Sequence, residues 1–227
     1  RLFKMGGAHA IGAFAYGTKT VPAVDKIVGP GSAYVSAAKA YVASDCPIDF
    51  YAGPTEIVIV SRNGNPDWIA SDLIAQAEHD PEARAILVTP NRPLATAVRT
   101  ALTKQLKEHP AAIPSIDTHG VAVVTKTIDE AIDLGNAISP EHAVTDTRAM
   151  ANRLVKAGTV FVGPYAAQAA GDYATGSNHV LPTAGVARFR GGLSASDFVR
   201  VNSVQQLNQR GLRRLAPSII SLAHAEG

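Results

Sequence analysis

Residues 56–89 read EIVIVSRNGNPDWIASDLIAQAEHDPEARAILVT, and the fold is predicted from this stretch. Two short runs rich in Ile and Val, EIVIVS at residues 56–61 and RAILVT at residues 84–89, are typical of buried strands. The segment between them predicts a helix over residues 65–80, with Asn65 as its N-cap and Pro66 at its first position. A strand, a helix and another strand in this order indicate a parallel sheet.

The same alternation continues on both sides of this stretch. A short strand that ends in a Gly-Pro-Gly turn is expected at residues 24–31, and further strands at residues 120–125 and 157–163. Helices are expected at residues 8–16, 32–44, 92–109 and 127–138. Thr127 and Glu130 predict a capping box at the start of the last helix. From about residue 195 the pattern becomes wholly helical. We therefore predict an α/β protein with mostly parallel sheets flanked by helices, forming incomplete Rossmann-like domains, and a helical C-terminal tail.

The composition excludes several classes of partner. The net charge of the 227 residues is only +2 and the basic residues are scattered, so we expect no nucleic-acid or membrane-surface partner. Without a long apolar run or a signal peptide, the cytoplasm is the expected location. The single cysteine, Cys46, is expected to fill apolar space. Because the chain starts at Arg1 and ends at Gly227 within a predicted helix, we expect a piece of a longer protein.

Gln76 and His79 form a polar pair beside the apolar stripe of the central helix. Residues three positions apart share one face of a helix, so their side chains can converge on one point. Histidine is a common metal ligand, and a glutamine carbonyl is a harder donor. The same spacing also fits the commoner case of a helix-end histidine with a local hydrogen bond and a solvated glutamine. Both interpretations remain open at this point.

Three further segments carry polar side chains that could perform chemistry. SPEHAV at residues 139–144 places Glu141 beside His142, two general-base groups, although exposed Glu–His pairs are common. GDYATGSNHVLPT at residues 171–183 is a long polar loop in which Asp172 is a candidate hard ligand and His179 is either a ligand or a structural residue. The turns GGAHAIG and GPGSAY precede helices and could receive a phosphate, but neither is a GxGxxG motif.

Taken together and in order, five segments resemble the histidinol dehydrogenase family: VDKIVGPGSAYVSAAK, DFYAGPTEIVIV, ASDLIAQAEHDP, SPEHAV and AGTVFVGPYAAQAAGDYATGSNHVLPTAGVARF. The resemblance covers essentially the whole chain, and the blocks AQAEHDP and GDYATGSNHVLPT are its most specific parts. It implies an enzyme dependent on Zn²⁺ and NAD that oxidises L-histidinol through histidinal to L-histidine.

The resemblance also implies roles for particular residues. The expected zinc ligands are Gln76, His79 and Asp172, and the expected acid/base pair is Glu141 with His142. The residues expected to contact the substrate are the zinc ligands with His142, Thr55 and Glu226. His9 and Ser32 stand where the family often has Gln and Asn in its NAD site, so we expect them to contact NAD. The fourth zinc ligand of the family would lie beyond Gly227.

On the same basis we predict three regions and a homodimer. Residues 1–48 would form the C-terminal half of the NAD-binding domain, residues 49–193 the catalytic domain, and residues 194–227 a helical C-terminal segment that completes the partner's active site. The chain alone is expected to be inactive. Two alternatives stay open, namely a related enzyme that oxidises another polar alcohol and a non-catalytic α/β binding or assembly module.

Overall fold

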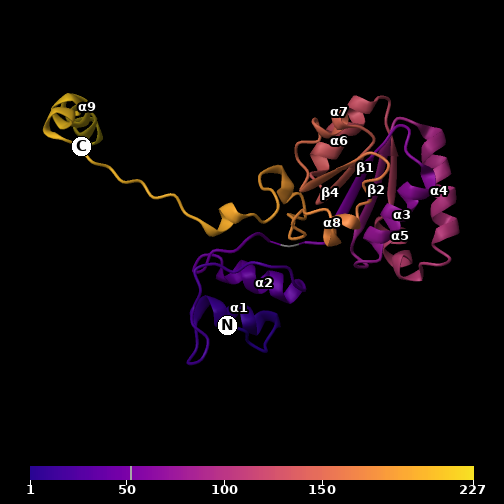
Figure 1. Cartoon of the computed structure of the whole chain (residues 1–227), viewed down its shortest axis with the longest axis horizontal. Helices are drawn as coiled ribbons and strands as arrows, with labels where there is room; N and C mark the ends of the chain where they lie inside the picture. Colours follow the sequence, from indigo (N-terminus) through magenta and orange to yellow (C-terminus); the bar gives the residue numbers. More distant parts are fainter. Residues whose placement is uncertain (52) are drawn as a thin grey trace. The chain divides into compact units, whose positions relative to one another are not determined.

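The larger of two compact units, Arg1–Ser194, contains a sheet of five parallel strands (Figure 1). The computed structural model describes residues 1–51 and 53–227. The strands are β1 (Glu56–Val60), β2 (Arg84–Thr89), β3 (Val121–Val124), β4 (His142–Thr145) and β5 (Thr159–Val162). Their order in the sheet is β3-β2-β1-β4-β5, so the chain builds outward from β1 and then crosses back to β4. The predicted α/β class is confirmed.

Helices cover both faces of this sheet, as Figure 1 shows. On one face lie α3 (Pro66–Ala77), α4 (Arg92–Gln105) and α5 (Ile113–His119), the last preceded by the short η1 (Pro110–Ala112). On the other face lie α6 (Ile128–Ile138) and α7 (Arg148–Ala151). Successive strand residues point to opposite faces, so Ile57 and Ile59 of β1 pack under α3 while Val58 and Val60 pack under α6. This two-sided burial explains why β1 is apolar throughout.

Two helix starts test the predicted caps. The Asn65 Oδ1 accepts hydrogen bonds from the backbone N of Asp67 at 2.9 Å and of Trp68 at 3.3 Å, as expected for an N-cap. At α6 the Thr127 hydroxyl accepts from the Glu130 backbone N at 3.1 Å. The Glu130 carboxylate, however, accepts from the backbone N of Lys126 at 2.8 Å. Only the Thr127 half of the predicted capping box is therefore formed, because the Glu130 side chain bonds the backbone N of Lys126 and not that of Thr127.

The prediction of a strand within residues 24–31 is wrong. Only Ile27 forms a parallel bridge, with Ile48. Gly29 has a φ of 117° and is followed by Pro30, and this backbone cannot continue a ladder of strand hydrogen bonds. Around this bridge α1 (Gly7–Tyr16) and α2 (Ala33–Val42) enclose a small apolar cluster that contains the buried Cys46.

The sequence interpretation also failed at shorter elements. The helices α5 and α7 and the strand β4, which begins at His142, were not predicted. The 171–183 segment begins within a short helix, α8 (Ala170–Tyr173), and a further short helix, η2 (Val186–Arg188), follows it. The helices α5 and α7, of seven and four residues, are shorter than the window over which an amphipathic helical pattern can be recognised.

The smaller unit, Ala195–Gly227, contains η3 (Ala195–Phe198) and α9 (Gln209–Glu226). The wholly helical pattern predicted from residue 195 is wrong for residues 199–208, which form no helix. This stretch contains Val199, Val201 and Val204, and β-branched residues lower helix propensity. The Asn208 side chain then accepts from the Gly211 backbone N at 2.8 Å and begins α9. No helix among the described residues is long and apolar enough to cross a membrane.

Candidate active site

The candidate catalytic side chains lie at the amino ends of two neighbouring central strands. Thr55 directly precedes β1, and Glu141 directly precedes β4, which begins at His142. The parallel register aligns Ile57 with His142, so these ends are adjacent. Because α3 runs back across the sheet after β1, its last turn, which carries Gln76, returns to the same edge. Residues far apart in sequence are thereby brought to one place.

A cavity of about 640 Å³ opens at this edge. Its walls include six side chains singled out in the sequence: Thr55, Gln76, His79, Glu141, His142 and Asp172. His179, from the polar loop, lines it as well. The cavity is also lined by Pro30 and Gly31, from the glycine turn considered above for a phosphate, and by residues that the sequence interpretation missed, among them Phe50 and Gln168. Gln168 is 3% exposed, and its position in the otherwise apolar run YAAQAAG was a signal that could have been noticed.

A chain of hydrogen bonds connects three of these side chains. The Gln76 Nε2 donates to the Thr55 hydroxyl at 2.7 Å, and the Thr55 hydroxyl in turn donates to the Glu141 Oε2. This direction of donation fixes the orientation of the Gln76 amide, since its nitrogen must face Thr55. The Gln76 Oε1 is buried and has no hydrogen-bond partner among the described residues. A buried acceptor without a donor is costly, so this oxygen is a candidate ligand for a cation.

Burial changes the acidity of Glu141. Desolvation raises the pKa of this carboxyl to about 7, and the negative charges of Glu56 and Asp172 act in the same direction. Hydrogen bonds from the Thr55 hydroxyl and the Glu56 backbone N stabilise the carboxylate and lower the pKa, but by less. Glu141 can therefore exchange a proton near neutral pH, which is what a general acid or base requires.

His142 responds to burial in the opposite direction. Desolvation lowers the pKa of its imidazole to about 4, and the nearby Asp172 offsets part of this effect. The Nδ1 lies 3.8 Å from the Glu141 Oε2 and has no hydrogen-bond partner among the described residues. The ring centroid lies 6.0 Å from that of Phe161. His142 is thus a neutral imidazole at pH 7 and is able to accept a proton.

The residues expected to bind zinc come from three different local structures. Gln76 is in the last turn of α3, whereas His79 lies beyond its end, so the prediction that both belong to one helical face is wrong. The chain still turns there, because the His79 backbone N donates to the Gln76 carbonyl at 3.3 Å. Asp172 is in α8. No group of three or more His, Cys, Asp and Glu residues suited to a metal occurs among the described residues. The expected set contains only two residues of those types, with the Gln76 amide as the third donor.

The remaining predicted site residues are His9, Ser32 and Glu226. His9 is exposed on α1 and Ser32 is the N-cap of α2 without a side-chain hydrogen bond to the helix. Neither is among the residues that line the cavity, although Pro30 and Gly31, next to Ser32, do line it. Glu226 is the last residue of α9 in the smaller unit.

A larger cavity, of about 770 Å³, lies at the opposite edge of the sheet. It is lined by Ser61, Trp68, Asp146 and Tyr165, among others, at the carboxyl ends of β1, β4 and β5. Ligands of open α/β sheets usually bind at this edge, where the strand order reverses. None of the predicted site residues is there. The assignment of the candidate site therefore depends on the paired Glu141 and His142 and their neighbours, and not on cavity size.

The fold and the site define an α/β protein with a buried acid and imidazole at the amino edge of a parallel sheet. The family model described as Histidinol dehydrogenase matches residues 1–227. The chain belongs to the histidinol dehydrogenase family.

Individual relatives agree with this assignment. A histidinol dehydrogenase of Agrobacterium fabrum is 46% identical over 233 residues, which cover 100% of this chain and 54% of the relative. One of Methanothermobacter thermautotrophicus is 43% identical, with 55% of its length covered. The crystal structure of histidinol dehydrogenase from Elizabethkingia anophelis matches with a TM-score of 0.91 at 35% identity and covers 98% of this chain and 53% of that one. The chain thus spans about half the length of the curated relatives it matches.

Proposed function

We propose that this chain forms the larger part of the catalytic site of an enzyme that oxidises L-histidinol with NAD, through histidinal, to L-histidine. The observation that carries the proposal is the hydrogen-bonded series from Gln76 through Thr55 to Glu141, in one cavity with the neutral imidazole of His142. Each of the two oxidations, of the alcohol and of the hydrated aldehyde, releases a proton and a hydride, and one NAD accepts the hydride each time. The protein must then supply a base for the proton.

In the first oxidation, His142 accepts the hydroxyl proton of the substrate on an imidazole nitrogen. Burial lowers the pKa of the ring, so it is unprotonated at neutral pH, and the negative charge of Asp172 stabilises the imidazolium that forms when the proton is transferred. In the second oxidation a water must add to the aldehyde, and the ionised form of Glu141 removes a proton from that water. Thr55 holds the Glu141 carboxylate in place through its donated hydrogen bond.

Gln76, His79 and Asp172 would hold the zinc ion expected for the family. The unpartnered Oε1 of Gln76 supports this assignment, because it is an oxygen donor that lacks a hydrogen bond within the cavity that His79 and Asp172 also line. Zinc would supply Lewis-acid polarisation and orientation of the substrate. We further propose that His9 and Ser32 contact NAD, that Glu226 contacts substrate, and that the enzyme acts as a cytoplasmic homodimer.

The test is turnover by a protein of full family length that carries this sequence. With NAD and Zn²⁺ present, we expect NADH to form from histidinol and from histidinal. His142→Asn should reduce both oxidations by about 10²–10⁴-fold, the usual size of general-base catalysis. Glu141→Gln should reduce mainly the oxidation of histidinal, where water is activated. Equal and mild effects of both changes on both substrates would contradict these roles.

A second candidate is the oxidation of another polar alcohol on the same scaffold. It is favoured by His9 and Ser32, which replace the Gln and Asn that the family often has at these positions. A comparison of kcat/KM for histidinol with that for other amino alcohols and for diols distinguishes the two candidates, since the authentic substrate should exceed the others by several orders of magnitude.

A further inference from the structure

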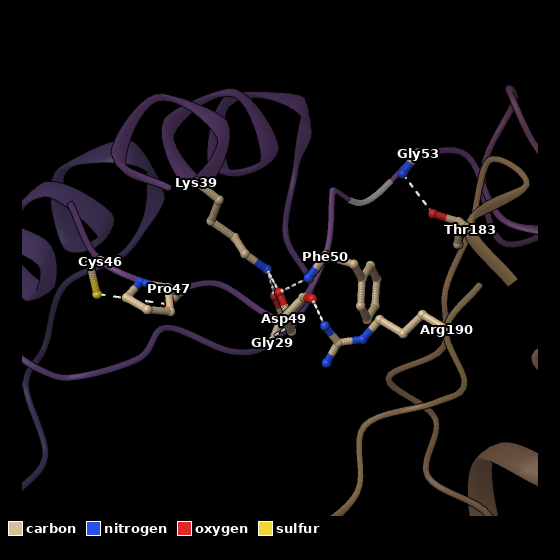
Figure 2. Close-up of polar contacts among 9 residues, drawn as sticks. All are labelled: Gly29, Lys39, Cys46, Pro47, Asp49, Phe50, Gly53, Thr183 and Arg190. Carbon is tan, nitrogen blue, oxygen red and sulfur yellow. Dashed lines mark hydrogen bonds and ion pairs between the residues drawn. The ribbon is translucent and has the colours of Figure 1, made fainter. Parts of the chain in front are cut away.

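A fully buried ion pair lies next to the candidate site but outside the set of residues considered so far. The Lys39 ammonium, on α2, donates to the Asp49 Oδ1 (Figure 2). Their side chains are only 2% and 0% exposed. Removing two charges from water is expensive, and an apolar pair of similar size often stabilises a fold equally well. The contacts that the pair makes should therefore indicate what it does.

Both side chains hold the backbone of one glycine. The Asp49 Oδ2 accepts from the Gly29 backbone N at 2.8 Å, while the Lys39 Nζ donates to the Gly29 carbonyl at 2.9 Å. Gly29 has a φ of 117°, a conformation that other residues rarely adopt. Its two backbone groups cannot join a strand there, so the ion pair satisfies them instead. We call Lys39 and Asp49, with their two bonds to Gly29, the glycine clamp.

The glycine clamp is continuous with the wall of the candidate site. Pro30 and Gly31, directly after Gly29, line the same cavity as Glu141 and His142. Phe50, whose backbone N donates to the Asp49 Oδ1 at 2.7 Å, lines it too. The Phe50 ring lies 5.7 Å from the Lys39 Nζ and 5.9 Å from the Arg190 guanidinium, which also donates to the Asp49 carbonyl (Figure 2). Movement at the clamp would therefore move part of the cavity wall.

We propose that Lys39 and Asp49 are positioning residues that fix the turn of Gly29, Pro30 and Gly31 against the candidate active site. This inference rests on the proposed function for its catalytic consequence. Ser32, which begins α2 immediately after the turn, has no side-chain hydrogen bond to its helix and so can contact a ligand. The clamp sets where this residue and the start of α2 stand relative to the catalytic pair. Neither Lys39 nor Asp49 lines the cavity, so each acts through the turn.

The first test measures the clamp without any activity. In the wild-type chain, hydrogen exchange followed by NMR should show the Gly29 and Phe50 amides exchanging at least about 100-fold more slowly than in the unfolded chain. Asp49→Asn removes the charge and one acceptor, and Lys39→Met removes the donor to the Gly29 carbonyl. Asp49→Asn should speed exchange of the Gly29 amide directly, because it changes the acceptor of that amide. Lys39→Met should do so indirectly, because it leaves the buried Asp49 carboxylate without its partner charge. The matched control is Asp129→Asn, which breaks the exposed pair of Arg153 and Asp129. It should leave Gly29 protected.

The second test measures the consequence in a protein of full family length. Loss of a hydrogen bond to a charged group should raise the KM for NAD about tenfold. The kcat should change by less than about threefold, because the catalytic pair itself is intact. A merely structural role would lower the melting temperature of Asp49→Asn and leave the KM for NAD equal to that of Asp129→Asn.

The outcomes separate this inference from the proposed function. A wild-type protein that fails to oxidise histidinol would overturn the proposed function, while the exchange rate at Gly29 would still decide whether the clamp exists. Fast exchange at Gly29 in the wild type would overturn the clamp even if Asp49→Asn did not fold. Lost protection at Gly29 with an unchanged KM for NAD would overturn its positioning role.

Discussion

Thr55 shows how much of the site depends on one hydroxyl group. It accepts from Gln76 and donates to Glu141, so Thr55→Val breaks both bonds while keeping the shape. The pKa of Glu141 should rise above about 7, because the bond from Thr55 lowers it. We expect kcat/KM for histidinal in a protein of full family length to fall by about 10–100-fold, the value of one hydrogen bond to a charged group. Thr55→Ser, which keeps the hydroxyl, should retain most of the activity. A Val variant as active as the Ser variant would exclude this role.

Asp72 provides a pH-dependent prediction away from the catalytic pair. Burial raises the pKa of its carboxyl from 3.8 to about 6, and one hydrogen bond from the Gln168 backbone N only partly opposes this. The folded state therefore holds the proton more tightly than the unfolded state does. The stability that this proton contributes is present below about pH 4 and is lost as the pH rises through 6.

Asp72→Asn removes the loss of stability that ionisation of Asp72 causes as the pH rises. We expect the variant to be about 1–2 kcal/mol more stable than the wild type at pH 8, after allowance for solvent screening, and equal to it near pH 4. Urea unfolding at the two pH values measures the difference. Asp129→Asn, at an exposed carboxylate, is the control and should show no such pH dependence. A variant that is less stable than the wild type at pH 8 would show that Asp72 needs its charge.

The sequence predicted the candidate residues better than their arrangement. Spacing suggested Gln76 with His79 and Glu141 with His142, the polar loop suggested Asp172, and the resemblance added Thr55. All of them line one cavity. The bonds between Thr55, Gln76 and Glu141 could not be predicted from spacing, because they depend on the register that aligns β1 with β4. Whether the three expected ligands bind zinc stays a prediction.

At the scale of elements, local signals were reliable where several of them agreed. In α3 the Asn65 cap, the proline after it and the apolar stripe all indicated one helix, and the helix forms at Pro66–Ala77. At residues 24–31 an apolar run before a glycine turn suggested a strand, but only Ile27 forms a bridge, and Gly29 bonds to Lys39 and Asp49 instead of to a neighbouring strand. These bonds join residues ten and twenty positions apart, which no local pattern reveals.

The cap of α3 gives the prediction for this scale. Asn65→Ala leaves the backbone N of Asp67 and Trp68 without their acceptor and should reduce the free energy of unfolding by about 1 kcal/mol. Asn65→Ser should restore most of it, since serine caps as well as asparagine. Because α3 carries Gln76 at its far end, the loss should be in stability with little change in the pKa of Glu141. Urea unfolding of both variants measures this, and an Ala variant as stable as the Ser variant would show that the cap contributes nothing.

At the scale of the whole molecule, the chain spans only part of the family length, and this predicts how the isolated chain behaves. The chain covers 54% of the Agrobacterium fabrum relative, so about half of that protein's length has no counterpart in the 227 residues. Several large apolar side chains are exposed, including Tyr165 at 91% and Leu2 at 93%. Exposed apolar surface of this kind favours association. The described residues also offer only three of the expected zinc donors.

We therefore expect the 227-residue chain by itself to produce no sustained NADH when it is given histidinol, NAD and Zn²⁺, and to retain little zinc after dialysis, because a site that lacks one ligand of four binds the metal weakly. The matched control is the same sequence within a protein of full family length, assayed under identical conditions. Absorbance of NADH over time and zinc content after dialysis are the two measurements. Sustained turnover by the chain alone at a rate close to that of the control would show that the 227 residues already contain a complete active site, and would contradict the assignment of essential contacts to the rest of the family length.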